Sequence, residues 1–271
     1  VAGRLATVPT LGLNPQSVAG VARESGDARF AWDAYRRFIQ LFGRIVLAQP
    51  GEPFEQAIAA RKQARGVRED TDLAAEDWES LCGEFKSRIA QATGKPFPEH
   101  PLDQLNLAIR AVFASWHGKR AQDYRRVHRI PEELGTAVSV CAMVFGNLGN
   151  DSGTGVCFTR NPVTGAKELY GEYLPCAQGE DVVAGLRTPR KISQLQRDLP
   201  GVYAQLAESA TRLERHYRDL QDIDFTVEHG KLWLLQTRSG NRSGQAAARF
   251  AVAPVAAGLV DGGAALAAGG P

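Results

Sequence analysis

The sequence is poor in the residues that build disulfide-rich, zinc-binding or membrane-spanning proteins. Only four cysteines occur, they lie far apart, and none forms a CxxC pair: Cys82, Cys141, Cys157 and Cys176. This spacing argues against a zinc site, and we expect reduced thiols in a cytoplasmic protein. No run of about 18 apolar residues is present, so we expect no membrane span and no membrane partner.

An excess of charge of one sign is also missing. The 32 Lys and Arg residues nearly balance 30 Asp and Glu residues, for a formal net charge of +2. We therefore expect no nucleic-acid partner, and any phosphate-binding surface must be local. The single methionine is Met143, and Val1-Ala2-Gly3-Arg4 lacks the layout of a signal peptide. We expect the numbering to begin inside a longer parent protein or after processing.

Helical periodicity dominates the first half of the chain. Asn14-Pro15 is typical of a helix start, with a capping side chain followed by proline at the first helical position. Apolar residues then recur at three- and four-residue spacing, which predicts amphipathic helices. The predicted helices cover about 27–47, 53–65, a stretch from 74 onward, and 102–116.

The pattern changes to strands near Ile130. The apolar, β-branched run 136–145 predicts a buried strand, because such runs suit sheet positions covered on both faces. The other predicted elements are strands at 156–160 and 167–173, a helical stretch 191–218 divided at Pro200-Gly201, a hairpin over 223–237, and a short helix through Arg249. We therefore expect an α+β fold.

The segment Asp222-Ile223-Asp224 is the sharpest local feature. On a strand its two carboxylates share one face, where they repel each other unless a cation lies between them, and Mg²⁺ suits oxygen ligands. On the partner strand Gln236 offers an oxygen to a metal, and Arg238 offers a fork to a phosphate. The alternative interpretation is a solvated hairpin with charged pairs, which the apolar flanks of the segment disfavour.

Two weaker features lie upstream. Residues 146–155 form a glycine-rich loop whose backbone N–H groups could cradle phosphates, although an ordinary turn is the default interpretation. Acidic and amide side chains then cluster beside glycines, which suits ribose or metal contact as well as a solvated turn. The members of this cluster are Glu172, Gln178, Glu180 and Asp181.

Several segments, taken together and in order, resemble the nucleotide-binding domain of pyruvate phosphate dikinases. The resemblance runs from near Leu11 to about Gly258. Its segments are Gly135-Thr136-Ala137-Val138, Met143-Val144-Phe145-Gly146-Asn147, Ser152-Gly153-Thr154-Gly155-Val156, Phe158-Thr159-Arg160-Asn161-Pro162, Gln178-Gly179-Glu180-Asp181-Val182-Val183-Ala184-Gly185, Arg187-Thr188-Pro189 and Leu235-Gln236-Thr237-Arg238.

The resemblance implies an ATP-grasp fold with a mostly helical insertion, ATP as substrate and Mg²⁺ as cofactor. The implied nucleotide contacts are Met143 and Val144 at the adenine, Thr154 and Gly155 in a loop over the phosphates, and Glu172 and Glu180 nearby. The implied metal ligands are Asp222, Asp224 and Gln236. By the same resemblance, Arg238 would serve the transferring phosphates, and Arg238 and Asp222 would be the catalytic residues.

The same resemblance implies a division of the chain and its partners. Residues 1–14 would be the remainder of an upstream ATP-grasp segment, 15–128 a helical subdomain, 129–240 the β-rich ATP-grasp subdomain, and 241–271 a linker helix and tail. The tail would lead to a phosphohistidine domain of the parent protein, which acts in cis or in trans. In the parent, ATP and orthophosphate would drive conversion of pyruvate to phosphoenolpyruvate, and a homodimer of the parent is among the expected assemblies.

The chain departs from the family pattern in ways that bear on activity. It has no glycine-rich lysine segment, no Thr-Ser-His phosphohistidine motif and no barrel domain, and Asp224 replaces the usual Glu, which shortens its reach by one methylene. We therefore expect it not to complete the dikinase cycle alone. The alternatives are a degenerate nucleotide- or partner-binding module, a purely structural module, or a relative such as phosphoenolpyruvate synthase or an antibiotic phosphotransferase.

Overall fold

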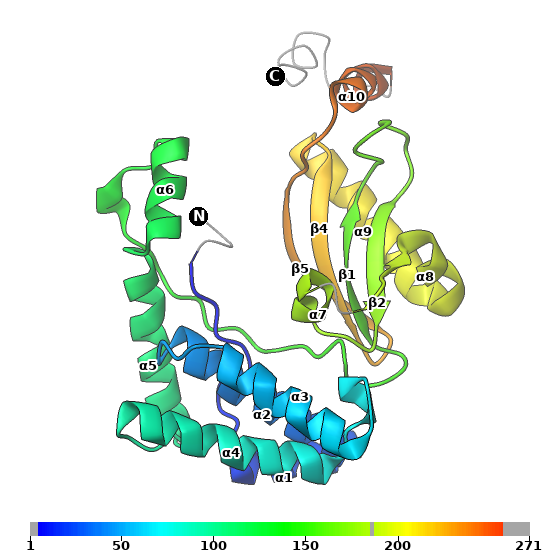
Figure 1. The fold of residues 1–271 in the computed structure, drawn as a ribbon. Helices are drawn as coiled ribbons and strands as arrows, with labels where there is room; N and C mark the ends of the chain where they lie inside the picture. The colour runs from blue at the N-terminus through cyan, green and yellow to red at the C-terminus, as the bar shows by residue number, and fades with distance from the viewer. Residues whose placement is uncertain (1–4, 185–186, 257–271) are drawn as a thin grey trace. The chain divides into compact units, whose positions relative to one another are not determined.

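The computed structural model describes residues 5–184 and 187–256, and the chain divides into two units, residues 1–143 and 144–271. The helical unit contains α1 Pro15–Ser25, α2 Ala28–Ile45, α3 Glu52–Arg65, α4 Ala75–Thr93, α5 Pro101–Ser115 and α6 Lys119–His128 (Figure 1). Asn14 caps α1 by accepting a hydrogen bond from the Ser17 backbone N–H, and Pro15 opens the helix. The helix start predicted at this dipeptide is therefore confirmed, as are the helices expected at α2 to α5.

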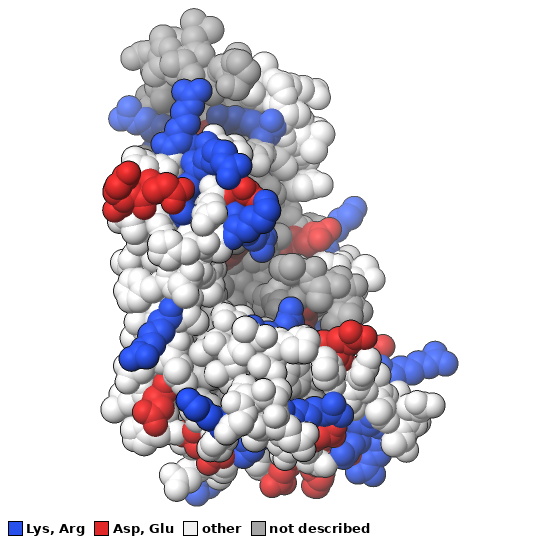
Figure 2. Space-filling view, turned by 60° about the vertical axis from the view of Figure 1, so that its left-hand side comes forward, with Lys and Arg blue, Asp and Glu red and all other residues white. Residues whose placement is uncertain are grey.

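The core of the helical unit lies between α2 and α4. Aromatic residues at helical spacing on α2, such as Tyr35, Phe38 and Phe42, are fully buried, and so is Trp78 on α4. Arg36 lies over the Trp78 ring at 4.5 Å, so this core also encloses a charge. Figure 2 shows Lys and Arg side chains interspersed with Asp and Glu side chains on the face in view.

The prediction of a strand over residues 136–145 is wrong. No residue of this run pairs with another strand within the described part of the chain, and its apolar side chains remain accessible, with Val140 67% and Met143 37% exposed. A β-branched run becomes a buried strand only where a neighbouring strand and a covering layer are available. The described residues supply neither to this segment.

The second unit is built on a five-stranded antiparallel sheet in the order β3-β2-β1-β4-β5. The strands are β1 Gly153–Phe158, β2 Tyr170–Pro175, β3 Arg190–Lys191, β4 Gln221–Glu228 and β5 Lys231–Ser239. The helices are α7 Gly179–Ala184, α8 Ile192–Asp198, α9 Pro200–Tyr217 and α10 Gly244–Ala256. Figure 1 shows α8 and α9 on one side of the sheet, where they pack on β2 and β4.

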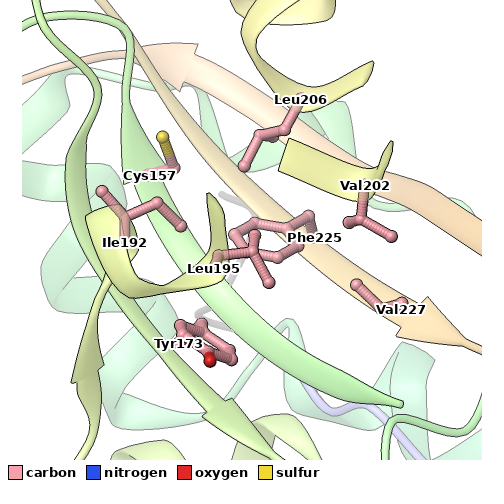
Figure 3. Packing of buried hydrophobic residues seen from close by; sticks show 8 residues of the cluster. All are labelled: Cys157, Tyr173, Ile192, Leu195, Val202, Leu206, Phe225 and Val227. Atoms are coloured by element: carbon pink, nitrogen blue, oxygen red, sulfur yellow. The ribbon is translucent and has the colours of Figure 1, made fainter. Parts of the chain in front are cut away.

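One face of the sheet carries the core of this unit. Alternate residues of β4, Phe225 and Val227, pack with Leu195 of α8 and with Val202 and Leu206 of α9. In Figure 3 the Phe225 ring lies near the middle of this cluster. The opposite face of the sheet, which we call the second face, therefore receives the intervening residues of each strand.

The sequence predicted most of this unit. The hairpin β4–β5, the helices divided at Pro200-Gly201 and the α+β fold class are confirmed. The two-residue strand β3 and the short helix α7 were not predicted, because neither is long enough to show a periodic pattern. None of the described helices has the length and apolar character needed to cross a membrane.

Candidate functional site

The two carboxylates of the Asp222-Ile223-Asp224 segment lie on the second face of the sheet. Ile223 is fully buried on the helix-covered side, and alternation along β4 turns its two neighbours the other way. The side chains of Asp222 and Asp224 remain 13% and 25% accessible, so the carboxylates sit on a partly covered surface and can reach a ligand.

The neighbouring strand β5 brings a complementary residue to each carboxylate. Asp222 lies directly opposite Arg238, and Asp224 directly opposite Gln236. Arg238 Nε donates to Asp222 Oδ2 at 2.8 Å, and its Nη2 lies 3.9 Å from Asp224 Oδ1. The Gln236 amide nitrogen donates to Asp224 Oδ2. The four side chains therefore form two hydrogen-bonded pairs, which the longer ion pair between Arg238 and Asp224 joins into one group that we call the β4–β5 cluster.

A β-bulge in β5 keeps this cluster in phase with the core. The partner of Asp224 is Gln236, whereas the partner of Phe225 is Leu234, so Leu235 has no residue opposite it. The extra residue absorbs the shift in register. Both the polar pairs and the apolar pairs of the hairpin can then stay on their own faces.

The electrostatics of the cluster favour cations. Hydrogen bonding to Asp222 raises the pKa of Arg238 above its usual range, so the guanidinium stays charged. Two carboxylates against one guanidinium leave a formal charge of −1. Within the described part of the chain, no group of three or more His, Cys, Asp or Glu side chains is arranged to hold a metal ion. A metal here would need ligands from Gln236 or from a bound molecule in addition to the two aspartates.

The second face continues across the sheet from this cluster. Asp224 lies opposite Val156, Val156 opposite Glu172, and Glu172 opposite Lys191 on the edge strand β3. Directly opposed residues in antiparallel strands point to the same face. Glu172 thus shares a row with the cluster, and Lys191 ends that row. Lys191 was not predicted as a site residue, because a two-residue strand is too short to show a periodic pattern.

Thr154 and Gly155 lie within β1, so the prediction that they belong to a loop is wrong. The Thr154 hydroxyl is buried and donates to the Phe225 carbonyl at 3.1 Å. A Cβ at Gly155 would lie 2.5 Å from the Glu172 carbonyl oxygen and 2.8 Å from Phe225 Cζ. Glycine is needed here because the backbone of β2 and the core ring approach closely, and β1 accordingly begins at Gly153.

The remaining glycine-rich loop is tied down by its surroundings. Ala177 N donates to Gly146 O, Cys176 N donates to Ser152 O, and the His229 backbone N–H donates to the Ser152 hydroxyl. A Cβ at Gly146 would come within 2.3 Å of the Ala177 carbonyl oxygen. These glycines allow neighbouring backbone segments to pack closely. The loop therefore fits the ordinary turn that the sequence left open as the alternative to a phosphate-binding loop.

The structure does not test three other expected site residues, Met143, Val144 and Glu180. Met143 is the last residue of the helical unit, and Val144 is the first of the sheet unit. The side chain of Glu180 lies outside the described residues. Their expected roles at the nucleotide stay predictions.

Comparison with known proteins decides the family. The sequence profile of the family described as "Pyruvate phosphate dikinase, AMP/ATP-binding domain" matches residues 67–203 and 201–255. The chain belongs to this family. The resemblance read from its motifs is thereby confirmed, and the described fold is the α+β arrangement expected of such a domain.

Individual dikinases are similar over almost the whole chain. Pyruvate, phosphate dikinase of Rhizobium meliloti is 50% identical over 270 residues, which cover 95% of this chain and 30% of the relative. Pyruvate, phosphate dikinase 2 of Zea mays is 50% identical over 259 residues, covering 96% of this chain and 29% of the relative. The Clostridium symbiosum enzyme is 51% identical, with coverages of 95% and 30%. The chain thus spans less than a third of these kinases.

Proposed function

We propose that this chain is the ATP-binding part of a pyruvate, phosphate dikinase-type phosphotransferase, and that the second face of its sheet holds the phosphates of Mg–ATP. The observation that carries the proposal is the β4–β5 cluster. It places two carboxylates, one amide and one guanidinium on adjacent rows of a sheet in a member of an AMP/ATP-binding family. No packing requirement of the fold calls for this combination of side chains.

The donor set of the cluster fits Mg²⁺. Asp222 and Asp224 supply the carboxylate oxygens that this ion prefers, and Gln236 can turn its amide oxygen toward it. When bound, the ion would neutralise charge on the phosphates. The aspartates and the amide would hold it, with the remaining ligands coming from the phosphates and water.

Arg238 has the role of a phosphate clamp in this proposal. Its side chain is 58% exposed, and only its Nε is committed to Asp222 at hydrogen-bonding distance. A guanidinium can exchange a carboxylate for a phosphate, because both anions accept hydrogen bonds from its planar set of N–H groups. Asp222 would position Arg238 before the nucleotide arrives and then serve the metal, which makes these two residues the catalytic pair.

The other nucleotide contacts are assigned by position. Glu172 shares a row with Asp224 and is proposed to face the ribose or the metal. Met143, Val144 and Glu180 are proposed to contact the nucleotide as the family resemblance implies. We propose that Thr154 and Gly155 act through the shape of β1, because one is hydrogen-bonded inside the sheet and the other packs against the core.

The whole reaction belongs to a longer protein in this proposal. A phosphohistidine domain, supplied in cis or in trans, would accept a phosphoryl group from ATP, orthophosphate would be consumed, and a further domain would act on pyruvate. The cytoplasmic location and a homodimer of the whole protein stay predictions of the same kind.

A degenerate nucleotide-binding module is the second candidate. Asp224 is one methylene shorter than the glutamate usual in the family, and it already accepts a hydrogen bond from Gln236. A ligand displaced by about an ångström loses much of its catalytic value. Such a chain would still bind nucleotide but would transfer its phosphoryl group slowly or not at all.

Calorimetric titration of the chain with ATP, in Mg²⁺ and in EDTA, tests the proposal. We expect Mg²⁺-dependent binding that Asp224→Asn weakens and Glu208→Gln, a change of an exposed carboxylate on α9, leaves unaltered. Asp224→Glu restores the side chain usual in the family. Tighter binding of Mg–ATP by this variant than by the unaltered chain would favour the second candidate, the degenerate nucleotide-binding module. Equal binding by Asp224→Asn and the unaltered chain would refute the site.

A further inference from the structure

A concave site lies on the helix-covered side of the sheet unit, away from the β4–β5 cluster. A hollow of about 760 Å³ opens between α9, the connection from β1 to β2, and α10. Figure 1 shows this connection and α10 at the same end of the sheet. The residues of α9 that line the hollow belong to the helix packed on β4, so the sheet itself separates the hollow from the β4–β5 cluster.

The walls of the hollow are held together by hydrogen bonds. Ser243, just before α10, donates its backbone N–H to Pro162 O and its hydroxyl to Val163 O. Gly165 has a φ of +72° and packs so closely on α10 that a Cβ would lie 2.9 Å from Arg249 Cβ. The hollow is therefore a built feature of this unit, with α10 fixed to the turn at 161–165.

The lining of the hollow is strongly basic. Arg160, Lys167, Arg215 and Arg249 face only two acidic lining residues, Glu168 and Glu214, which leaves a formal excess of two positive charges. Among the described residues, the side chains of Lys167 and Arg215 form no ion pair or hydrogen bond. Two cations at the rim are thus available to a ligand from solution.

Arg160 gives the hollow a fixed, buried cation. Its side chain is 6% exposed, and its Nε and Nη2 donate to the Glu214 carboxylate at 2.8–3.0 Å, while the Phe250 ring lies 5.2 Å away. Its Nη1 makes no hydrogen bond within the described structure and remains able to donate. A guanidinium held on one edge by a carboxylate, with its other edge free, is preorganised to receive an anion.

We propose that this hollow is a binding site for a phosphate group, carried by a small phosphorylated molecule, and that it is separate from the nucleotide site on the second face. Phosphate suits the lining because its oxygens accept from forked and flexible cations at once, as Arg160, Arg215 and Lys167 present them. The volume leaves room for the rest of a small metabolite beside the phosphate.

Titration of the chain with inorganic phosphate, followed by amide NMR shifts at constant ionic strength, tests the inference. We expect saturable shifts at residues 165–169 and 210–215. Arg215→Ala should weaken the apparent affinity about ten-fold, the loss expected for one charge-assisted contact. The Arg215 side chain is exposed and has no ion pair or hydrogen bond among the described residues, so we expect this variant to stay folded, and Arg212→Ala, an exposed neighbour on α9, is the matched control.

Further arms separate this site from the others. Arg238→Ala should leave the shifts at the hollow unchanged, whereas their loss in that variant would show that phosphate binds at the β4–β5 cluster instead. Equal shifts with chloride would show ionic screening and overturn the inference. Shifts produced by an acidic peptide and not by phosphate would also overturn the inference, because the hollow would then be a protein-docking surface.

Discussion

Gly155→Ala separates a packing role for this glycine from a role in cradling phosphates. The added methyl group would lie 2.5 Å from the Glu172 carbonyl oxygen, 2.8 Å from Phe225 Cζ and 2.9 Å from Tyr173 Cβ. The carbonyl belongs to the β1–β2 ladder and cannot move without parting the two strands. Overpacking of this kind costs about 1–3 kcal/mol, and the closeness of a backbone atom places this case toward about 3 kcal/mol.

The assay for this variant must report on the sheet unit alone. Hydrogen exchange of peptides from β1 and β4 should show the full loss of protection, while peptides from α2 and α4 should be unchanged. The melting temperature of the unit should fall by about 10 °C. Gly201→Ala, where a Cβ meets no atom within 4 Å in the first turn of α9, is the control and should be neutral or slightly stabilising. Unaltered exchange in Gly155→Ala, together with lost ATP binding, would refute the packing argument.

Three further predictions concern buried groups. Glu214→Ala leaves the buried Arg160 without its carboxylate, and we expect a loss of about 3–5 kcal/mol in urea unfolding; a change below about 1 kcal/mol would show that the pair contributes little. Burial raises the pKa of the Cys157 thiol to about 12. Maleimide labelling at pH 8 should therefore modify the exposed Cys141 in the folded protein and Cys157 only after unfolding. Rapid labelling of both thiols in the folded protein would contradict the burial of Cys157. Burial would raise the pKa of Asp33, but two neighbouring arginines hold it below its usual range. Its stabilisation is therefore present above about pH 4 and lost as pH falls through the folded pKa, so the stability difference between Asp33→Asn and the unaltered chain should shrink from pH 6 to pH 3.

The sequence predicted those features that depend on local patterning. The helix start at Asn14-Pro15 follows from cap chemistry, and the faces of β4 follow from simple alternation about Ile223. The pairing of Asp222 with Arg238 was predicted only as a shared site, because the bulge at Leu235 that sets its register has no sequence signature. Local patterning therefore located the site residues, and long-range pairing fixed their partners.

The failures also have a physical reason. The run 136–145 has the composition of a strand, but strand formation depends on a partner that composition does not reveal. A glycine-rich segment can serve either a flexible loop or a close approach of backbones, so the sequence alone does not distinguish these two roles for Gly155. Only the positions of Glu172 and Phe225 show which applies. The basic hollow was not predicted, because its lining comes from three separate segments.

Thermal unfolding with and without millimolar Mg–ATP tests the central claim most directly. At about 100 times its dissociation constant, a ligand adds about 2.7 kcal/mol, which corresponds to a rise of about 5–10 °C for a unit of this size. We predict that the unaltered chain and Arg212→Ala show this rise, that EDTA abolishes it, and that Arg238→Ala lacks it. An equal rise in Arg238→Ala would contradict the account, because the β4–β5 cluster would then not be where the nucleotide phosphates bind.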